Sequence, residues 1–178
     1  ALGVSDRQVN IIGEGVDCVI RGGQLGDPLL VARQLMSLDY GTYASPQYLQ
    51  RHGTPAHPDD LREGHVLASY FPPGTERPMP MVFEKSGQRI EIEAAKFTTN
   101  DGEAHVALLQ AGLGIGQHFS MCVRPLLERG ELVEVLPGWS RPSFPLHIIY
   151  PPGGLRSARL SAFIDWILKY WGDPDRLG

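Results

Sequence analysis

The sequence lacks most of the features that would assign it to a class of proteins at once. Only two cysteines, Cys18 and Cys122, are present in 178 residues, each inside a short apolar run, so we expect two reduced, buried thiols rather than a disulfide framework. No stretch approaches the roughly 20 apolar residues of a membrane-spanning helix, and the N-terminus lacks the regions of a signal peptide. These absences predict a soluble cytoplasmic protein without a membrane partner, although a mature secreted protein would also have lost its signal.

An excess of positive charge is also missing. The chain has 16 Lys and Arg against 20 Asp and Glu, which gives a formal net charge of −4 at pH 7 and a pI near 5.8. Without a basic field, this chain is not expected to bind nucleic acid or anionic lipid by itself. Its 42% of hydrophobic and 20% of charged residues are ordinary for a globular protein and predict one good core or two smaller ones.

Motifs for catalysis and metal binding are absent as well. The sequence has no Gly-x-Ser-x-Gly elbow of a hydrolase. The nearest approach to a metal cluster is a set of three histidines separated by five and eight residues in a Pro-rich stretch, His52, His57 and His65. A zinc site on a helix needs ligands one turn apart, so solvated loop histidines are the simpler interpretation. We therefore expect no enzyme activity, no catalytic residue, no metal and no cofactor.

What the sequence does contain is a regular alternation of apolar runs and amphipathic stretches. These predict strands over 16–20, 66–70, 115–119, 132–136 and 146–150, and a hairpin of 81–85 with 88–93. Capping residues and apolar spacing predict helices over 6–14, 46–52, 101–111, 121–129 and 157–171, with a further helical turn within 54–64. Residues 29–44 are expected to be extended chain that leaves one sheet and enters another region.

Two of these helices have an apolar face. In the helix capped by Asn100-Asp101 and ended by Gly112, one face carries Ala104, Ala107, Leu108 and Ala111. In the last helix, the residues that share a face are Leu160, Phe163, Ile164, Ile167 and Trp171. We expect the last helix to dock on a sheet.

Strands that alternate with helices predict a mostly parallel α/β architecture interrupted by one antiparallel hairpin. The chain changes character near 36–44 and again near 142–146, which indicates two lobes and two crossings between them. Two crossings imply a hinge. A cleft between lobes, rimmed by strand ends and helix N-termini, is where such folds place small ligands.

Polar residues at the ends of the predicted elements are candidate binding groups. Ser45 and Thr99-Asn100 stand at helix N-termini, where free N–H groups and the helix dipole favour an anion. Simple capping is an equal alternative for them and the better interpretation for Asp101. Arg21 ends a buried strand, where its guanidinium could hold an anion or could pair with a neighbouring carboxylate, that of Asp17 or Asp27.

Gly112, Gly114 and Gly116 form a Gly-x-Gly-x-Gly pattern that differs from a dinucleotide-binding motif. Such a motif follows a strand and opens a helix, whereas these glycines follow a helix and lead into a strand. We interpret Gly112 and Gly114 as a left-handed helix stop and a point of close backbone packing. Gly116, beside Gln117 and His118, could instead make room for a ligand.

Several phrases together resemble the effector-binding domain of LysR-type transcriptional regulators. They occur in the family's order and cover nearly the whole chain: 14–21 (EGVDCVIR), 30–33 (LVAR), 44–49 (ASPQYL), 52–55 (HGTP), 59–61 (DDL), 99–101 (TND), 111–115 (AGLGI) and 129–133 (RGELV). The resemblance implies two Rossmann-like lobes with a ligand cleft between them, the type 2 periplasmic-binding-protein-like fold, with two crossover strands as a hinge. Lobe one would comprise 1–43 and 147–178, and lobe two 44–146.

The resemblance also implies a site and partners. The cleft positions that match the family's motifs are Arg21, Gly22, Ser45, Phe71, Thr99, Asn100, Gln117 and His118. They would bind a small-molecule effector, for which we expect a small organic acid, in a homodimer, or a tetramer of the full-length protein. In the family a winged helix-turn-helix binds DNA; this part, with the first strand and helix of lobe one, would precede the point where the sequence begins.

Two alternatives share the fold. A periplasmic solute-binding protein would need a secretory start and gains nothing from two apolar, unpaired cysteines. An enzyme such as a deaminase or dehydratase relative would need a catalytic constellation that the sequence does not show. The effector-sensing domain is therefore the main hypothesis.

Overall fold

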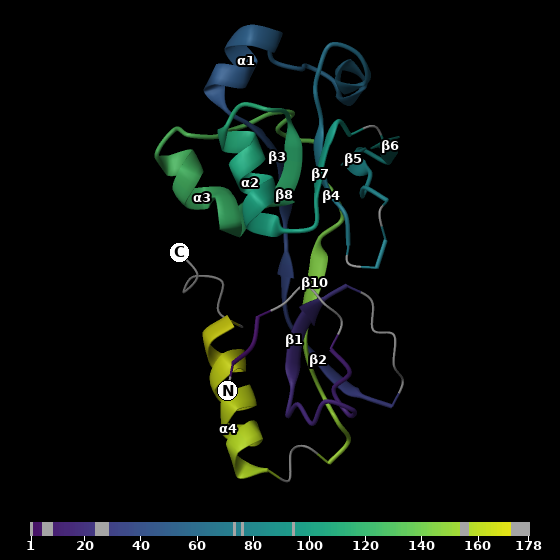
Figure 1. Cartoon of the computed structure of the whole chain (residues 1–178), viewed down its shortest axis with the longest axis vertical. Coiled ribbons are helices and arrows are strands. Elements are labelled where there is room, and N and C mark those ends of the chain that lie inside the picture. The colour runs from purple at the N-terminus through teal and green to yellow at the C-terminus, as the bar shows by residue number, and fades with distance from the viewer. Residues whose placement is uncertain are drawn as a thin grey trace. The chain divides into compact units, whose positions relative to one another are not determined.

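The computed structural model describes residues 2–4, 9–23, 29–72, 74–75, 77–93, 95–153 and 157–171 (Figure 1). The chain forms two compact units, one of Ala1–Arg7 with Asp39–Pro142 and the other of Gln8–Leu38 with Ser143–Gly178. From residue 8 onward it changes unit at 38/39 and 142/143, a few residues before the expected lobe boundaries at 43/44 and 146/147. The assignment of these units to two ligand-binding lobes stays a prediction.

The smaller unit is built on a three-stranded antiparallel sheet. Its strands, in spatial order, are β1 (Val19–Gly22), β10 (Phe144–Tyr150) and β2 (Val31–Leu38). Helix α4 (Ala158–Trp171) lies along this sheet. Its apolar positions and the sheet form one core, which buries Leu35, Ile148, Tyr150, Leu160, Ile164 and Ile167. Because burial of each such side chain is worth about 1.5–3 kcal/mol, this core fixes the helix on the sheet.

The expected apolar face of α4 is confirmed except at one position. Leu160, Ile164 and Ile167 are buried, and Trp171 packs against the same core. Phe163 is 38% exposed and stacks on Trp166, with ring centroids 6.1 Å apart. At 100° per residue Phe163 stands at the edge of the face that the buried residues define, which explains why it reaches solvent.

The larger unit contains the remaining strands. β3 (Tyr40–Ala44) pairs antiparallel with β8 (Gly116–Phe119) and β9 (Val133–Glu134), and β4 (Ala68–Tyr70) pairs parallel with β7 (Phe97–Thr99). A parallel bridge between Leu67 and Ile115 places β4 next to β8. β5 (Met81–Lys85) and β6 (Gln88–Ile92) form the expected hairpin. The helices of this unit are α1 (Pro46–His52), η1 (Pro58–Arg62), α2 (Gly102–Gln110) and α3 (Ser120–Glu128).

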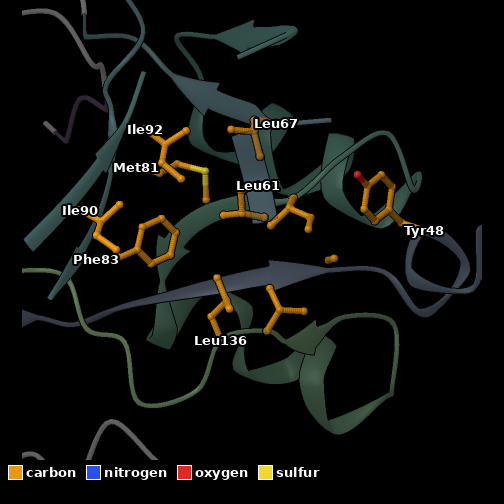
Figure 2. Close-up of a cluster of buried hydrophobic side chains, with 11 residues drawn as sticks. Tyr48, Leu61, Leu67, Met81, Phe83, Ile90, Ile92 and Leu136 are labelled. Carbon is orange, nitrogen blue, oxygen red and sulfur yellow. The ribbon is translucent and has the colours of Figure 1, made fainter. Parts of the chain in front are cut away.

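Two apolar clusters stabilise the larger unit. In the first, hairpin residues such as Phe83 and Ile90 point toward Leu61 and Leu67 (Figure 2). In the second, α2 and α3 pack on the sheet and bury Tyr43, Ala68, Leu109, Val123, Leu126 and Leu132. The strands therefore pack against the β5–β6 hairpin, α1 and η1 in the first cluster and against α2 and α3 in the second.

The expectation of a mostly parallel sheet is wrong for the described strands. Only β4 with β7, and the bridge from β4 to the start of β8, run parallel. The reason is the double crossing. β2 leaves the smaller unit and β10 returns to it, so these neighbours run in opposite directions. β3 likewise runs against β8 and β9.

The helix expected over 6–14 is not observed where the structure describes it. Residues 11–15 form turns, and 5–8, which include the expected cap at Ser5, lie outside the described residues. Val9 and Ile12 had suggested a helical face; of the described residues here, Ile11 is the buried one. The local turn is held by Asn10, whose side-chain oxygen accepts from the Gly13 N–H at 2.9 Å.

The expected exposure of the cysteines is also corrected. Both thiols are free, as expected, but Cys122 is exposed and Cys18 is partly buried. Helix α3 turns Val123 and Leu126 toward the core. Cys122 precedes Val123 by one residue and so lies about 100° away from the buried face.

Candidate functional site

The ends of two parallel strands bring several predicted site residues together. β4 ends at Tyr70 and β7 at Thr99, which are partners in the parallel register. The Phe71 N–H donates to the Thr99 carbonyl at 2.9 Å. The chain then passes Asn100, which is exposed, and enters α2. Carboxyl ends of parallel strands next to a helix N-terminus are a common place for a ligand site.

The N-terminus of α2 is capped as the sequence predicted. Asp101 has an extended backbone, and its carboxylate accepts from the Ala104 N–H at 2.7 Å. The Thr99 hydroxyl oxygen accepts from the Asp101 N–H at 3.2 Å. Thr99 thus takes part in the local turn, whereas no hydrogen bond to another described residue holds the Asn100 side chain. Of the capping residues, Asn100 is the one whose side chain is free to meet a ligand.

His118 stands beside this helix end. A Cβ on Gly102, the first residue of α2, would lie 3.6 Å from His118 Cε1. One turn along the helix, His105 is 1% exposed, and its Nδ1 lies 3.5 Å from His118 Nδ1. The structure therefore joins His118 to Thr99 and Asn100 through the first turn of α2, although these residues are distant in sequence.

The hydrogen bonds of this histidine pair define its protonation. His105 Nε2 lies 3.1 Å from the Ala68 carbonyl, which can only accept, so this nitrogen carries a proton. In the neutral ring Nδ1 is then an acceptor, and His118 Nδ1 donates to it. The remaining nitrogen of His118, Nε2, is an acceptor.

Both histidines favour the neutral state. Burial lowers the pKa of His105. Burial, followed by the proximity of His105, lowers the pKa of His118 to about 4. At neutral pH His118 therefore offers a ligand a hydrogen-bond acceptor and no positive charge.

Gly116 has a role other than the one considered from the sequence. A Cβ there would lie 2.7 Å from His105 Nε2 and 2.9 Å from the Ala68 carbonyl oxygen. The glycine thus makes room for the hydrogen bond between His105 and Ala68. The interpretations of the other two glycines are confirmed: Gly112 has φ of 68°, and a Cβ on Gly114 would lie 2.7 Å from the Val66 carbonyl oxygen.

Gln117 faces the opposite side of β8 from His118, because neighbouring side chains in a strand alternate. Its Oε1 accepts from the Val82 N–H at 3.0 Å, and its Nε2 donates to the Val82 carbonyl at 2.8 Å and to Thr42 Oγ1 at 3.3 Å. Reversal of the amide would place donor against donor at Val82, so this orientation is determined. Gln117 connects β8 to β5 and β3.

Next to Gln117 lies a residue that the sequence did not single out, Arg141. Its guanidinium carbon is 4.4 Å from the centroid of the Tyr40 ring, and its Nη1 donates to Gln117 Oε1 at 3.2 Å. No local pattern marks Arg141, since it follows a loop around Trp139. Only the partners that the fold brings to it distinguish it from other arginines.

Ser45 is not part of this arrangement. It is 3% exposed, and its hydroxyl caps α1 by accepting from the Tyr48 N–H at 3.2 Å. A Cβ on Gly112, beyond the C-terminal end of α2, would lie 3.1 Å from Ser45 Oγ. Thr99 and Asn100 precede the other end of α2, which at 1.5 Å per residue is roughly 14 Å long. The capping interpretation of Ser45 is confirmed, and a ligand contact of this residue stays a prediction.

Arg21 and Gly22 belong to the smaller unit. Arg21 lies opposite His147 in the β1–β10 pair. Within the described residues no ion pair joins Arg21 to Asp17, while Asp27 lies outside them. A Cβ on Gly22 would overlap the Phe144 ring, so this position requires glycine for packing.

The histidine-rich segment is not arranged as a metal site. Within the part of the chain that the structure describes, no group of three or more His, Cys, Asp or Glu side chains is placed to hold a metal ion. His52 ends α1, and His57 caps η1. Between them and His65, Asp60 accepts from the His57 and Ala56 N–H groups, both at 2.9 Å. Among the helices of the described residues, none has the length and hydropathy needed to cross a membrane.

Sequence comparison identifies the family. Residues 1–172 match the model of the LysR substrate binding domain. An HTH-type transcriptional repressor of Pseudomonas aeruginosa is 32% identical over 173 residues, which is 97% of this chain and 54% of that protein. The uncharacterised HTH-type regulator YhjC of Escherichia coli is 37% identical over 163 residues, 91% of this chain and 54% of that protein. The chain thus spans about half the length of these curated relatives.

Structure comparison gives the same answer. The full-length Vibrio cholerae virulence activator AphB superposes with a TM-score of 0.83 at 25% identity, covering 96% of this chain and 57% of AphB. The CrgA regulatory domain of Neisseria meningitidis gives 0.78 at 29% identity, covering 92% and 79%. These relatives are transcriptional regulators, not enzymes, and the alternative of a periplasmic solute-binding protein is not favoured. The chain belongs to the LysR family of transcriptional regulators, as a substrate-binding domain with the type 2 periplasmic-binding-protein-like α/β fold.

Proposed function

We propose that this domain is the effector sensor of a LysR-type regulator and that it binds a small organic acid. The observation that carries the proposal is the arrangement of Phe71, Thr99, Asn100 and His118 at the carboxyl ends of β4 and β7, beside the first turn of α2. N–H groups at a helix N-terminus favour an anionic ligand, and neutral His118 supplies an acceptor for a hydroxyl or amide on the same molecule.

The effector controls transcription in this proposal through its unequal affinity for two arrangements of the protein. Homodimerisation or tetramerisation would relay the change to the DNA-binding segment of the full-length regulator. Cytoplasmic location follows from this role. The ligand cleft expected between two lobes, with Arg21 and Gly22 contributed by the smaller unit, stays a prediction.

The test is a thermal-shift screen of the purified chain against small carboxylic acids and aromatic metabolites. A ligand at 100 times its Kd stabilises the folded state by about 2.7 kcal/mol, which for this size raises Tm by roughly 5–10 °C. The same screen is run on Asn100→Ala and His118→Ala, with Gln50→Ala, an exposed amide on α1, as the matched control.

A compound that stabilises the parent and Gln50→Ala but neither site variant supports the proposal. Asn100→Ala is the cleaner variant, since Asn100 is exposed and its removal should leave Tm unchanged without ligand. Equal stabilisation of all four proteins contradicts the site. Absence of any shift across the panel contradicts binding of this class of effector.

A further inference from the structure

Arg141 is a positive charge held by neutral groups. It lies between β9 and β10 and is partly buried. Its guanidinium covers the Tyr40 ring at 4.4 Å, and its Nη1 donates to Gln117 Oε1 at 3.2 Å and to the Pro80 carbonyl at 3.4 Å. Burial raises the pKa of Tyr40, so this phenol is uncharged at neutral pH. None of the three partners offsets the charge of the guanidinium.

Within the described residues no ion pair joins Arg141 to a carboxylate. Glu91 is near enough to influence Arg141 electrostatically, but Arg89 holds its carboxylate, with Nη2 at 2.6 Å and Nε at 2.8 Å. Burial lowers the pKa of Arg141, yet an arginine in a protein keeps its charge. The structure thus contains a partly desolvated cation whose charge is uncompensated, an arrangement that costs stability unless an anion accompanies it.

The guanidinium is also held in one orientation. Both amide atoms of Gln117 bond to the backbone of Val82, so the oxygen that receives Arg141 Nη1 is fixed. The Tyr40 ring lies against the guanidinium, with its centroid 4.4 Å from the guanidinium carbon. The Nε–H and the Nη2 group make no hydrogen bond to a described residue. These are the two donors that form the fork for bidentate binding of a carboxylate.

We propose that Arg141 binds a carboxylate of the effector that reaches the face of β8 opposite His118, and that Tyr40 and Gln117 are the residues that position Arg141. This inference rests on the proposed function and names the residue of the sensor that recognises the negative charge of the effector. A planar carboxylate matches the free fork better than a neutral amide does, because both oxygens accept and the charge is cancelled. Gln117, which the sequence placed among the ligand contacts, acts here through Arg141.

The test follows the side-chain Nε–H signal of Arg141 by ¹⁵N NMR of the whole chain. The probes are benzoate and its neutral amide, benzamide, at constant ionic strength, with inorganic phosphate as a third arm. The variants are Arg141→Gln, which removes the charge, and Arg141→Lys, which keeps the charge but removes the fork. Arg51→Gln is the matched control, because Arg51 is exposed in the last turn of α1.

We expect benzoate to shift the Arg141 signal to saturation, with an apparent Kd at least tenfold lower than for benzamide or phosphate. Arg141→Gln should weaken benzoate binding at least tenfold and Arg141→Lys several-fold, whereas Arg51→Gln should have no effect. A Tm measured without ligand shows whether each variant is folded. Arg141→Lys, with its smaller change, keeps the inference testable if Arg141→Gln unfolds.

The backbone amide signals of Thr99, Asn100 and His118 separate this inference from the proposed function. Benzoate that shifts these signals but leaves Arg141 unchanged, with full affinity in Arg141→Gln, overturns the role of Arg141 and leaves the sensor proposal intact. Benzamide or phosphate binding as tightly as benzoate overturns the carboxylate assignment. Absence of any saturable shift at Arg141 overturns it as well, while failure of the wider panel of compounds is the separate outcome that contradicts sensing.

Discussion

His105 and His118 face each other across α2 and β8 with their Nδ1 atoms 3.5 Å apart. One nitrogen of this pair is committed to the Ala68 carbonyl, and only one proton can lie between the two rings. The pair is therefore stable when both rings are neutral. Protonation of His118 would place a buried charge next to His105.

Stability should consequently fall in mild acid. The pKa of His118 is about 4 in the folded protein and about 6.5 in the unfolded chain, so below pH 6.5 the unfolded chain binds protons that the folded protein refuses. Neutral His118 contributes on the order of 3 kcal/mol to the free energy of unfolding. This contribution is fully present above about pH 7, declines as the pH falls, and is lost near pH 4. Urea unfolding between pH 4 and 7.5 measures it.

The control for this pH dependence is His118→Gln, which keeps a polar side chain without the titration. Its unfolding free energy should change less steeply between pH 6.5 and 4.5 than that of the parent. Parallel profiles for the two proteins would show that His118 is not the titrating group.

Replacement of Gly116 should disrupt the same pair. In Gly116→Ala the new Cβ would approach His105 Nε2 to 2.7 Å and the Ala68 oxygen to 2.9 Å, so the hydrogen bond between them must lengthen or break. We expect a loss of about 2–4 kcal/mol in unfolding free energy from overpacking and the lost bond. Gly102→Ala is the matched control, because its Cβ makes an ordinary 3.6 Å contact with His118. A loss below 0.5 kcal/mol in Gly116→Ala would contradict this explanation.

Tyr48 supports the loop that precedes β4. Its hydroxyl accepts from the Val66 N–H at 2.7 Å and lies 3.2 Å from His65 Nδ1. Tyr48→Phe leaves the Val66 N–H without this partner and should cost about 1–3 kcal/mol in chemical unfolding. Tyr43→Phe, which loses one bond to the Ser120 hydroxyl, should cost less. The reverse order of the two losses would be inconsistent with this role for Tyr48.

The two thiols should differ in reactivity. Cys122 is exposed, whereas Cys18 is partly buried. Burial raises the pKa of both thiols, and the neighbouring Asp17 also raises that of Cys18. Labelling with a disulfide reagent at pH 8 should therefore show a faster phase that disappears in Cys122→Ser and a slower one that disappears in Cys18→Ser. Equal rates, or loss of the fast phase in Cys18→Ser, would refute the assignment.

The sequence alone determined the elements whose signals are local. Ser45 and Gly53 stop α1 at the two expected ends, because an N-cap and a terminal glycine act within one turn. Ser86 and Gly87 have φ of 51° and 81°, as a two-residue hairpin turn requires. The family resemblance, carried by ordered short phrases, likewise needed no tertiary contact.

Only the tertiary structure decided which side chains meet. The expected face of α2, on Ala104, Ala107 and Ala111, is wrong: these alanines are exposed, and the helix buries His105 and Leu109 instead. Alanines bury little apolar area, whereas His105 gains a hydrogen bond to Ala68, 37 residues away. The short strand β7 escaped prediction because three residues give no period to detect.

The candidate site divides in the same way. Thr99 and Asn100 became candidates because they stand at a predicted helix N-terminus, where unpaired backbone groups gather, whereas Phe71 became one only through the family resemblance; their part in binding stays a prediction. Ser45 looked equivalent, but its place at the far end of α2 depends on how α1 packs. Arg141 carried no signal, since an isolated arginine after a loop is ordinarily solvated. Its charge is uncompensated because its partners, Tyr40, Gln117 and Pro80, are neutral. They lie far from Arg141 in sequence and are brought to it by the fold.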